Sequence, residues 1–176
     1  MRLSLDQVEE RVKHLRYLED AVELNERLRC GAAEFHVPHG ITVELQYYRA
    51  GGDVYLEAAL SGEIRGTCAR CAEDFTFAMG TDLRAVLSPR GTQPGHAGSE
   101  EAEDLGLGFY EGDEIDITAL VYEHALLALP TRAVCTEACR GLCMRCGANL
   151  NTGSCSCPHE AVGIRFRTGL VSRRPA

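Results

Sequence analysis

The chain has 176 residues, of which 45 % are apolar, enough for one domain with a packed core. No apolar run reaches the length of about eighteen residues that a membrane span needs, and the charged N-terminal sequence does not resemble a signal peptide. We therefore expect a cytoplasmic protein. The net charge of −8 is uneven: residues 130–176 carry +5, and the remainder carries −13. This asymmetry favours an anionic partner at the C-terminal end, although the arginines there could also simply flank a metal site.

The N-terminal residues 1–30 are expected to form an amphipathic helix. Apolar residues recur at helical spacing over residues 6–28, with charged residues between them. The positions that define this face are Leu5, Val8, Val12, Leu15, Leu18 and Val22. Cys30-Gly31 follows as a helix stop, and Cys30 itself is expected to be a buried or half-buried apolar residue.

Residues 31–134 predict an antiparallel sheet, an acidic loop and a second helix. Segments 40–68 and 75–87 are rich in β-branched and aromatic residues, with turns expected at Gly51-Gly52 and Gly62. Residues 88–108 are rich in glycine, proline, serine and acidic residues, which is typical of a solvated loop. The next segment reads as a helix with Asp116 as its N-cap and Pro130 at its end. The strand aromatics fit core packing better than base stacking: Tyr47, Tyr48, Tyr55, Phe75 and Phe77.

The cysteine pattern is the strongest chemical signal in the chain. Six of the nine cysteines lie within residues 135–157, and all but Cys30 fall into close pairs. The pairs are Cys68/Cys71, Cys135/Cys139, Cys143/Cys146 and Cys155/Cys157. A cytoplasmic chain keeps its thiols reduced, and structural zinc takes four sulfur ligands in a tetrahedron. Four pairs therefore predict two structural zinc sites.

The spacing of the pairs suggests how they combine. Cys143-x2-Cys146 is followed by Gly147, as in a zinc-knuckle turn, and its nearest neighbour in sequence is the pair Cys155/Cys157. These two pairs would close a local site. The remaining two pairs would then form a long-range site that ties the strands to the segment after the second helix. Cross-pairing, for example of Cys139 with the knuckle, is the main alternative.

Other uses of the cysteines are possible from the sequence. A C-x2-C dithiol can be redox-active, but that motif normally lies between a strand and a helix of a βαβ unit, which the pattern here does not contain. Iron–sulfur binding uses the same ligands as zinc. A site with four cysteines leaves no open metal position, and we find no catalytic constellation, so the sequence predicts a protein that is not an enzyme and has no small-molecule substrate.

The chain resembles the YceD family, also called large ribosomal RNA subunit accumulation proteins. The resemblance rests on Cys-x-Arg-Cys at 68–71, Leu129-Pro130, and C-x3-C-x-G-L-C-x2-C-G-x-N-L-N from Cys135 to Asn151, within residues 41–165. Family members commonly have Asp-Pro-Arg after the last cysteines, where this chain has Gly163-Ile164-Arg165. The resemblance implies a bacterial or plastid protein that acts in accumulation and processing of large-subunit ribosomal RNA.

Together these signals predict an α+β protein with an antiparallel sheet, two helices and a C-terminal zinc-knuckle region with a basic tail, residues 135–176. The expected partners are ribosomal RNA, or ribosome-assembly and RNA-processing proteins. In the first case the RNA contacts would come from arginines. The candidates are Arg132, Arg140, Arg145, Arg165, Arg167, Arg173 and Arg174. The alternatives are a zinc-stabilised adaptor that binds a ribosomal protein or processing enzyme through its acidic surface, and a nuclease, for which we find no site.

Overall fold

The computed structural model describes residues 1–32, 34–91 and 106–158 and confirms the α+β class. Its main sheet holds six strands and is accompanied, within the described residues, by the α-helices α1 (Ala21–Leu28) and α2 (Ile117–Ala128). The six strands are β2 (Lys13–Glu19), β3 (Phe35–His36), β4 (Ile41–Ala50), β5 (Asp53–Thr67), β6 (Asp74–Pro89) and β7 (Gly106–Tyr110). A second, two-stranded sheet pairs β1 (Arg2–Ser4) with β8 (Glu114–Asp116), and the 3-10 turn η1 (Leu5–Gln7) follows β1.

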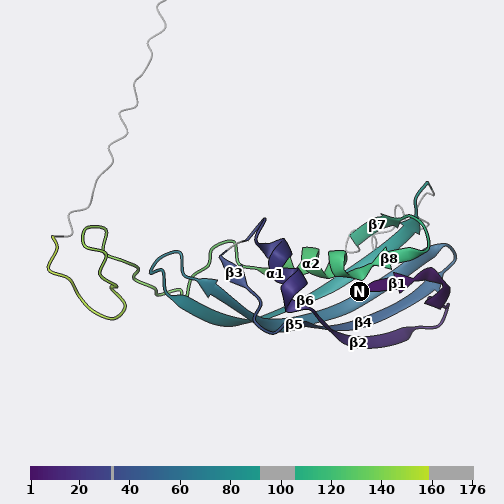
Figure 1. Ribbon diagram of the computed structural model, residues 1–176, viewed down its shortest axis with the longest axis horizontal. Helices are drawn as coiled ribbons and strands as arrows, with labels where there is room; N and C mark the ends of the chain where they lie inside the picture. Colours follow the sequence, from purple (N-terminus) through teal and green to yellow (C-terminus); the bar gives the residue numbers. More distant parts are fainter. Residues whose placement is uncertain (33, 92–105, 159–176) are drawn as a thin grey trace, which may run out of the picture.

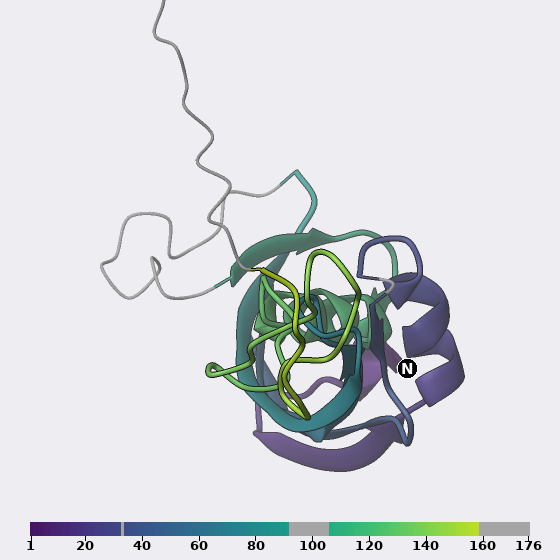
Figure 2. The same ribbon diagram turned by 90° about the vertical axis from the view of Figure 1, so that its left-hand side faces the viewer.

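The main sheet is antiparallel except at one edge. Its order is β2-β4-β5-β6-β7, and β3 pairs with β5 where Phe35 lies opposite Gly66. The neighbours β6 and β7 run parallel, which the sequence analysis did not anticipate. Figure 1 shows an elongated molecule in which β5 and β6 extend well beyond the other strands. Seen along its length, the sheet curves into a trough around α2 (Figure 2).

The core fills the concave side of this trough. Strict alternation buries every second residue of β4 and β5, so that Val43 and Leu45 face Leu56 and Leu60 on the same side. From the opposite direction α2 contributes Ile117, Val121 and Ala125, all buried. The expected helix is confirmed: the Asp116 carboxylate accepts from the Ala119 amide at 3.2 Å, and the helix stops just before Leu129-Pro130.

The long N-terminal helix expected over residues 6–28 is wrong. Only Ala21–Leu28 is helical, and residues 13–19 instead form β2, paired in register with β4. Three of the residues taken as the apolar face are largely exposed, with exposed fractions of 45 % for Val12, 63 % for Leu18 and 65 % for Val22. The β2 strand buries Glu19 and half-buries Leu15 and Tyr17. A period of two, together with pairing to β4, therefore overrides the helical spacing.

Of the two glycine turns expected between the strands, one is confirmed. Gly51 has a φ of +62° in the two-residue connection from β4 to β5. Gly62, in contrast, lies inside β5 between Ile41 and Met79 of the neighbouring strands. A Cβ at this position would lie 3.2 Å from the Gly40 carbonyl oxygen. Gly62 therefore allows the neighbouring backbone to approach closely and does not form a turn. The loop expected over 88–108 is shorter at both ends, because β6 continues to Pro89 and β7 begins at Gly106; its middle, 92–105, lies outside the described residues.

Candidate metal centres

The first pair of cysteines lies at the tip of the longest hairpin. Cys68 and Cys71 stand in the connection between β5 and β6, where the Cys68 amide donates to the Glu73 carbonyl and the Ala72 amide donates to the Cys68 carbonyl. Ala72 adopts a left-handed φ of +57° to close this turn. The chain after α2 runs back to the same tip, and the Ala69 amide donates to the Ala133 carbonyl at 2.7 Å. Two segments more than sixty residues apart therefore meet there.

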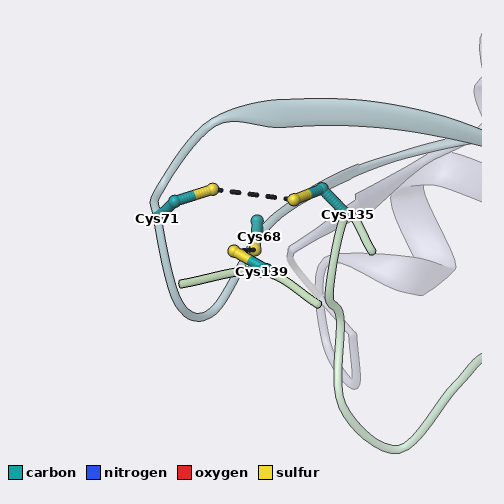
Figure 3. A group of neighbouring side chains, drawn as sticks. All are labelled: Cys68, Cys71, Cys135 and Cys139. Atoms are coloured by element: carbon teal, nitrogen blue, oxygen red, sulfur yellow. Dashed lines mark hydrogen bonds between the residues drawn. The ribbon is translucent and has the colours of Figure 1, made fainter. Parts of the chain in front are cut away.

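This meeting assembles the first centre, which we define as Cys68, Cys71, Cys135 and Cys139. Figure 3 shows that the sulfurs from the hairpin tip face those from the segment after α2. The Cys68 and Cys139 sulfurs are 3.8 Å apart, and so are those of Cys71 and Cys135. Cys135 is half-buried, whereas the other three sulfur-bearing side chains are buried. Phe75 and Val134 pack against the group.

The second centre lies entirely within residues 143–157, directly after the first centre in sequence. It comprises Cys143, Cys146, Cys155 and Cys157, and its ligand atoms all lie within 4.8 Å of one another. Cys146 is exposed and the last two cysteines are half-buried. The Gly147 amide donates to the Cys143 carbonyl, and Gly147 has a φ of +74°. A Cβ there would meet no atom within 4 Å, so the left-handed backbone conformation is the feature that favours glycine at this position.

Both groups have the form of metal sites and not of disulfides. A tetrahedral zinc site with Zn–S bonds of about 2.3 Å places its sulfurs about 3.8 Å apart, whereas a disulfide needs about 2.05 Å. The 3.8 Å separations in the first centre match the metal geometry. The two groups are also the combination expected from the spacing, with no cross-pairing. Eight cysteines can thus hold two metal ions, and no histidine of the described residues joins either group.

Backbone amides prepare each centre for anionic sulfur. Burial raises the pKa of the Cys68 thiol, but amide donors from Cys135, Cys71 and Arg70 outweigh it and bring the pKa to about 6. The amides of Cys146 and Arg145 likewise lower the pKa of Cys143 to about 6. Each centre therefore holds a thiol whose pKa lies well below its usual value, and a hydrogen bond from Asn151 also lowers the pKa of Cys139 in the first centre. Metal binding would remove the remaining protons.

Two asparagines connect the centres, and the sequence analysis missed both. The Asn151 side-chain amide donates to the Cys139 sulfur at 3.3 Å, while its oxygen accepts from the Arg140 amide at 2.7 Å. Asn149 donates to Glu73 beside the hairpin tip and accepts from the Asn151 amide. The segment that holds the second centre therefore makes a direct hydrogen bond to a sulfur of the first centre. The repeated asparagine in Asn149-Leu150-Asn151 was the signal in the sequence.

Arg70, the arginine of the Cys-x-Arg-Cys motif, also supports the metal centres, and the sequence did not point to this role. Its guanidinium donates to the carbonyl oxygens of Glu137 and Cys139 at 2.9 and 3.0 Å. Its own carbonyl accepts from the Leu142 amide, at a place where Gly141 has a φ of +74° and a Cβ would lie 2.9 Å from that oxygen. Arg70 therefore links the hairpin to the start of the second centre.

The candidate RNA-binding arginines are only partly placed. Arg132, Arg140 and Arg145 are exposed at the cysteine-rich end of the molecule, close in sequence to the two centres. Arg165, Arg167, Arg173 and Arg174 lie outside the described residues. Cys30 is exposed and belongs to neither centre, so the expectation that it is buried is wrong.

The family model for large ribosomal RNA subunit accumulation protein YceD matches residues 56–170, well over half of the chain. This chain belongs to the YceD family. The matched region contains all eight cysteines of both centres. The family resemblance noted in the sequence is thereby confirmed.

Two curated plant relatives share this family name. The chain is 28 % identical over 162 residues to large ribosomal RNA subunit accumulation protein YCED homolog 1, chloroplastic, of Zea mays, a match that covers 74 % of the chain and 53 % of the relative. It is 42 % identical over 50 residues to the Arabidopsis thaliana protein of the same name, covering 28 % of the chain and 16 % of the relative. The chain thus spans about half or less of the relatives it matches. No solved structure is significantly similar to it.

None of the helices in the described ranges combines the length and the apolar character that a membrane crossing requires.

Proposed function

We propose that this protein is a non-catalytic factor in the accumulation, processing or stability of large-subunit ribosomal RNA, and that two zinc ions fix its cysteine-rich end for RNA binding. Membership of the YceD family carries the first part. The two tetracysteine centres support the second, because four sulfur ligands leave a zinc ion no open position for water or substrate. Zinc would act there as a structural element, and the surrounding residues would orient the two turns.

The electrostatics of this end restrict how it can bind RNA. Residues 130–176 carry +5 from side chains, but a divalent ion with four thiolates adds roughly −2 at each centre. Most of the positive charge is therefore offset locally. N–H donors such as Asn151 and the backbone amides spread part of the thiolate charge. Productive RNA contacts would then come from exposed arginines on the metal-held turns, and Arg140 and Arg145, which follow Cys139 and precede Cys146 in sequence, are described examples.

The test is the salt dependence of binding to large-subunit RNA fragments. Each phosphate contact on a single strand contributes a slope of about 0.7 in log affinity against log salt. Replacing Arg140 and Arg145 by glutamine should weaken binding and lower the slope by about one to two, with an unchanged melting temperature. Arg16 and Arg84, both exposed on the sheet, provide a control pair with the same change in net charge.

The second candidate function is an adaptor that recognises a basic protein. It is favoured by the −13 carried by residues 1–129. An adaptor predicts no salt-dependent RNA affinity in the wild type, or an equal loss in the Arg16/Arg84 control pair. Either result would remove the RNA-binding role while leaving the family assignment intact.

A further inference from the structure

The cysteine-rich end presents a short row of exposed side chains. Residues 139–144 alternate strictly between buried and exposed positions. The buried residues are Cys139, Gly141 and Cys143, and the two cysteines belong to the first and the second metal centre. The exposed residues, which we call the outward row, are Arg140, Leu142 and Met144. One cation and two apolar side chains therefore lie on the solvent side of a segment that both centres anchor.

Hydrogen bonds hold the backbone of the outward row in place. The Arg140 amide donates to the Asn151 side-chain oxygen at 2.7 Å. The Leu142 amide donates to the Arg70 carbonyl at 3.0 Å, and Leu142 also forms an antiparallel bridge with Asn149. A ligand would therefore meet a backbone that is already ordered, which lowers the entropic cost of binding.

The two apolar residues of the row can contact the flat face of an aromatic ring. Met144 is 93 % exposed and Leu142 is 38 % exposed, and within the described residues 130–158 they are the large apolar side chains that are exposed. These residues contain no phenylalanine, tyrosine or tryptophan. Apolar contact with a ligand at this end must then come from leucine and methionine, and the flexible, polarizable methionine side chain makes favourable contacts with aromatic rings.

Arginines on both sides of the apolar pair select an anionic ligand. Arg140 begins the outward row and Arg145 directly follows Met144, and both are exposed. Phosphates beside flat apolar rings are the combination that an RNA strand offers. In a duplex the base faces are stacked on one another, whereas in an unpaired segment they are free to contact protein side chains. Leu142 and Met144 can therefore reach base faces only where the RNA is unpaired.

We propose that the outward row binds unpaired segments of RNA, with Arg140 on a phosphate and with Leu142 and Met144 against the faces of bases. The proposal rests on the RNA-binding function proposed above and names the form of RNA that this end selects. Base contacts supply affinity that does not depend on net charge. They therefore add to binding at an end where the thiolates offset most of the positive charge.

The probe is a short oligouridylate, compared with an RNA duplex of the same length by fluorescence anisotropy over a range of salt concentrations. Met144→Gln keeps the length of the side chain but removes its apolar character. It should weaken single-strand binding about threefold to tenfold, which corresponds to roughly 25–55 Å² of apolar surface, and leave duplex binding unchanged. Its salt slope should equal that of the wild type because no charge is lost, whereas Arg140→Gln should lower the slope by about 0.7. Leu18→Gln, at a β2 residue that is 63 % exposed, is the control and should change neither quantity.

The methyl group of Met144 reports the contact directly. The chain has three methionines, of which Met79 is buried in the main core with an exposed fraction of 4 %. In protein labelled with carbon-13 at the methionine methyl groups, the oligouridylate should shift the Met144 resonance through the ring currents of the bases. The Met79 resonance should stay in place, and the spectrum of Met144→Gln assigns the signal.

Equal affinity for the duplex and the single strand, or an unchanged single-strand affinity in Met144→Gln, would overturn the proposal. In either case a lower salt slope in the Arg140 and Arg145 double variant would still support the proposed RNA-binding function. A wild-type protein without salt-dependent RNA affinity would remove both. Self-association that Met144→Gln abolishes would instead assign the apolar pair to a contact between copies of this chain, which also overturns the proposal.

Discussion

Asn151 shows how much a single side chain can contribute to a metal centre without being a ligand. It belongs to the turn of the second centre, yet its amide donates to the Cys139 sulfur of the first, and its oxygen holds the Arg140 amide. Four thiolates around one divalent ion leave excess negative charge, and N–H donors stabilise it. The largest influence on the pKa of Cys139 is this Asn151 hydrogen bond, which lowers it.

Asn151→Ala should therefore weaken metal retention at the first centre by about tenfold to a hundredfold, the range typical for residues that orient metal ligands. Asn151→Asp should be worse, since a carboxylate would face the thiolate. Cadmium-113 NMR of the substituted protein resolves the two centres and can follow the loss of each to a chelator. The neighbouring exposed Thr152→Ala is the control. Equal losses from both centres, or none in Asn151→Ala, would contradict this role.

At the scale of elements, the sequence predicts those strands, turns and helix ends that are determined by residues close to one another in the chain. Alternation and the Gly51-Gly52 turn identify β4 and β5, and Asp116 with Pro130 delimits α2. The cysteine grouping is the one that the spacing suggested, because the second centre closes within residues 143–157, although the spacing left cross-pairing open. What the sequence does not reveal depends on distant contacts. The β2 strand satisfies a helical pattern as well, and only its pairing with β4 decides the outcome. The contacts of Arg70 with residues near 139 depend likewise on the chain returning after α2.

The two centres should differ in what they stabilise. Cys71 ties the β5–β6 hairpin to the segment after α2, and Phe75 packs against both this centre and the main core. Cys71→Ser should therefore lower the main melting transition, since a structural zinc contributes on the order of 10 kcal/mol in small modules. Cys146→Ser removes a ligand that is exposed and local. It should leave the main transition near the wild-type temperature while amides of residues 141–158 exchange faster.

Circular dichroism melting and hydrogen exchange measure these two effects. Cys30→Ser, a change at an exposed cysteine outside both centres, controls for the loss of a thiol. The pairing would be wrong if Cys146→Ser collapsed the main transition and Cys71→Ser did not.

At the scale of the whole molecule, the cysteine-rich end lies apart from the main core. The two metal centres, with Arg140 and Arg145 next to them in sequence, occupy one end of the elongated molecule (Figure 1). The curved sheet and α2 form one continuous core. The long strands β5 and β6 carry Cys68 and Cys71 at their tip, so the sheet itself positions the cysteine-rich end and a flexible linker does not.

The metal content tests the organisation of the cysteine-rich end as a unit. We expect two zinc ions per chain by elemental analysis, and their removal by a chelator should be biphasic. The second centre should empty first, because Cys146 is exposed and Cys155 and Cys157 are only half-buried, whereas three ligands of the first centre are buried. Loss of the ion from the second centre should leave the circular dichroism of the sheet intact. Loss of the ion from the first centre should change it. A single ion per chain would mean that only one group binds metal. Iron with a visible absorption band would assign a cluster instead of zinc, and emptying in the reverse order would show that burial does not control access to these centres.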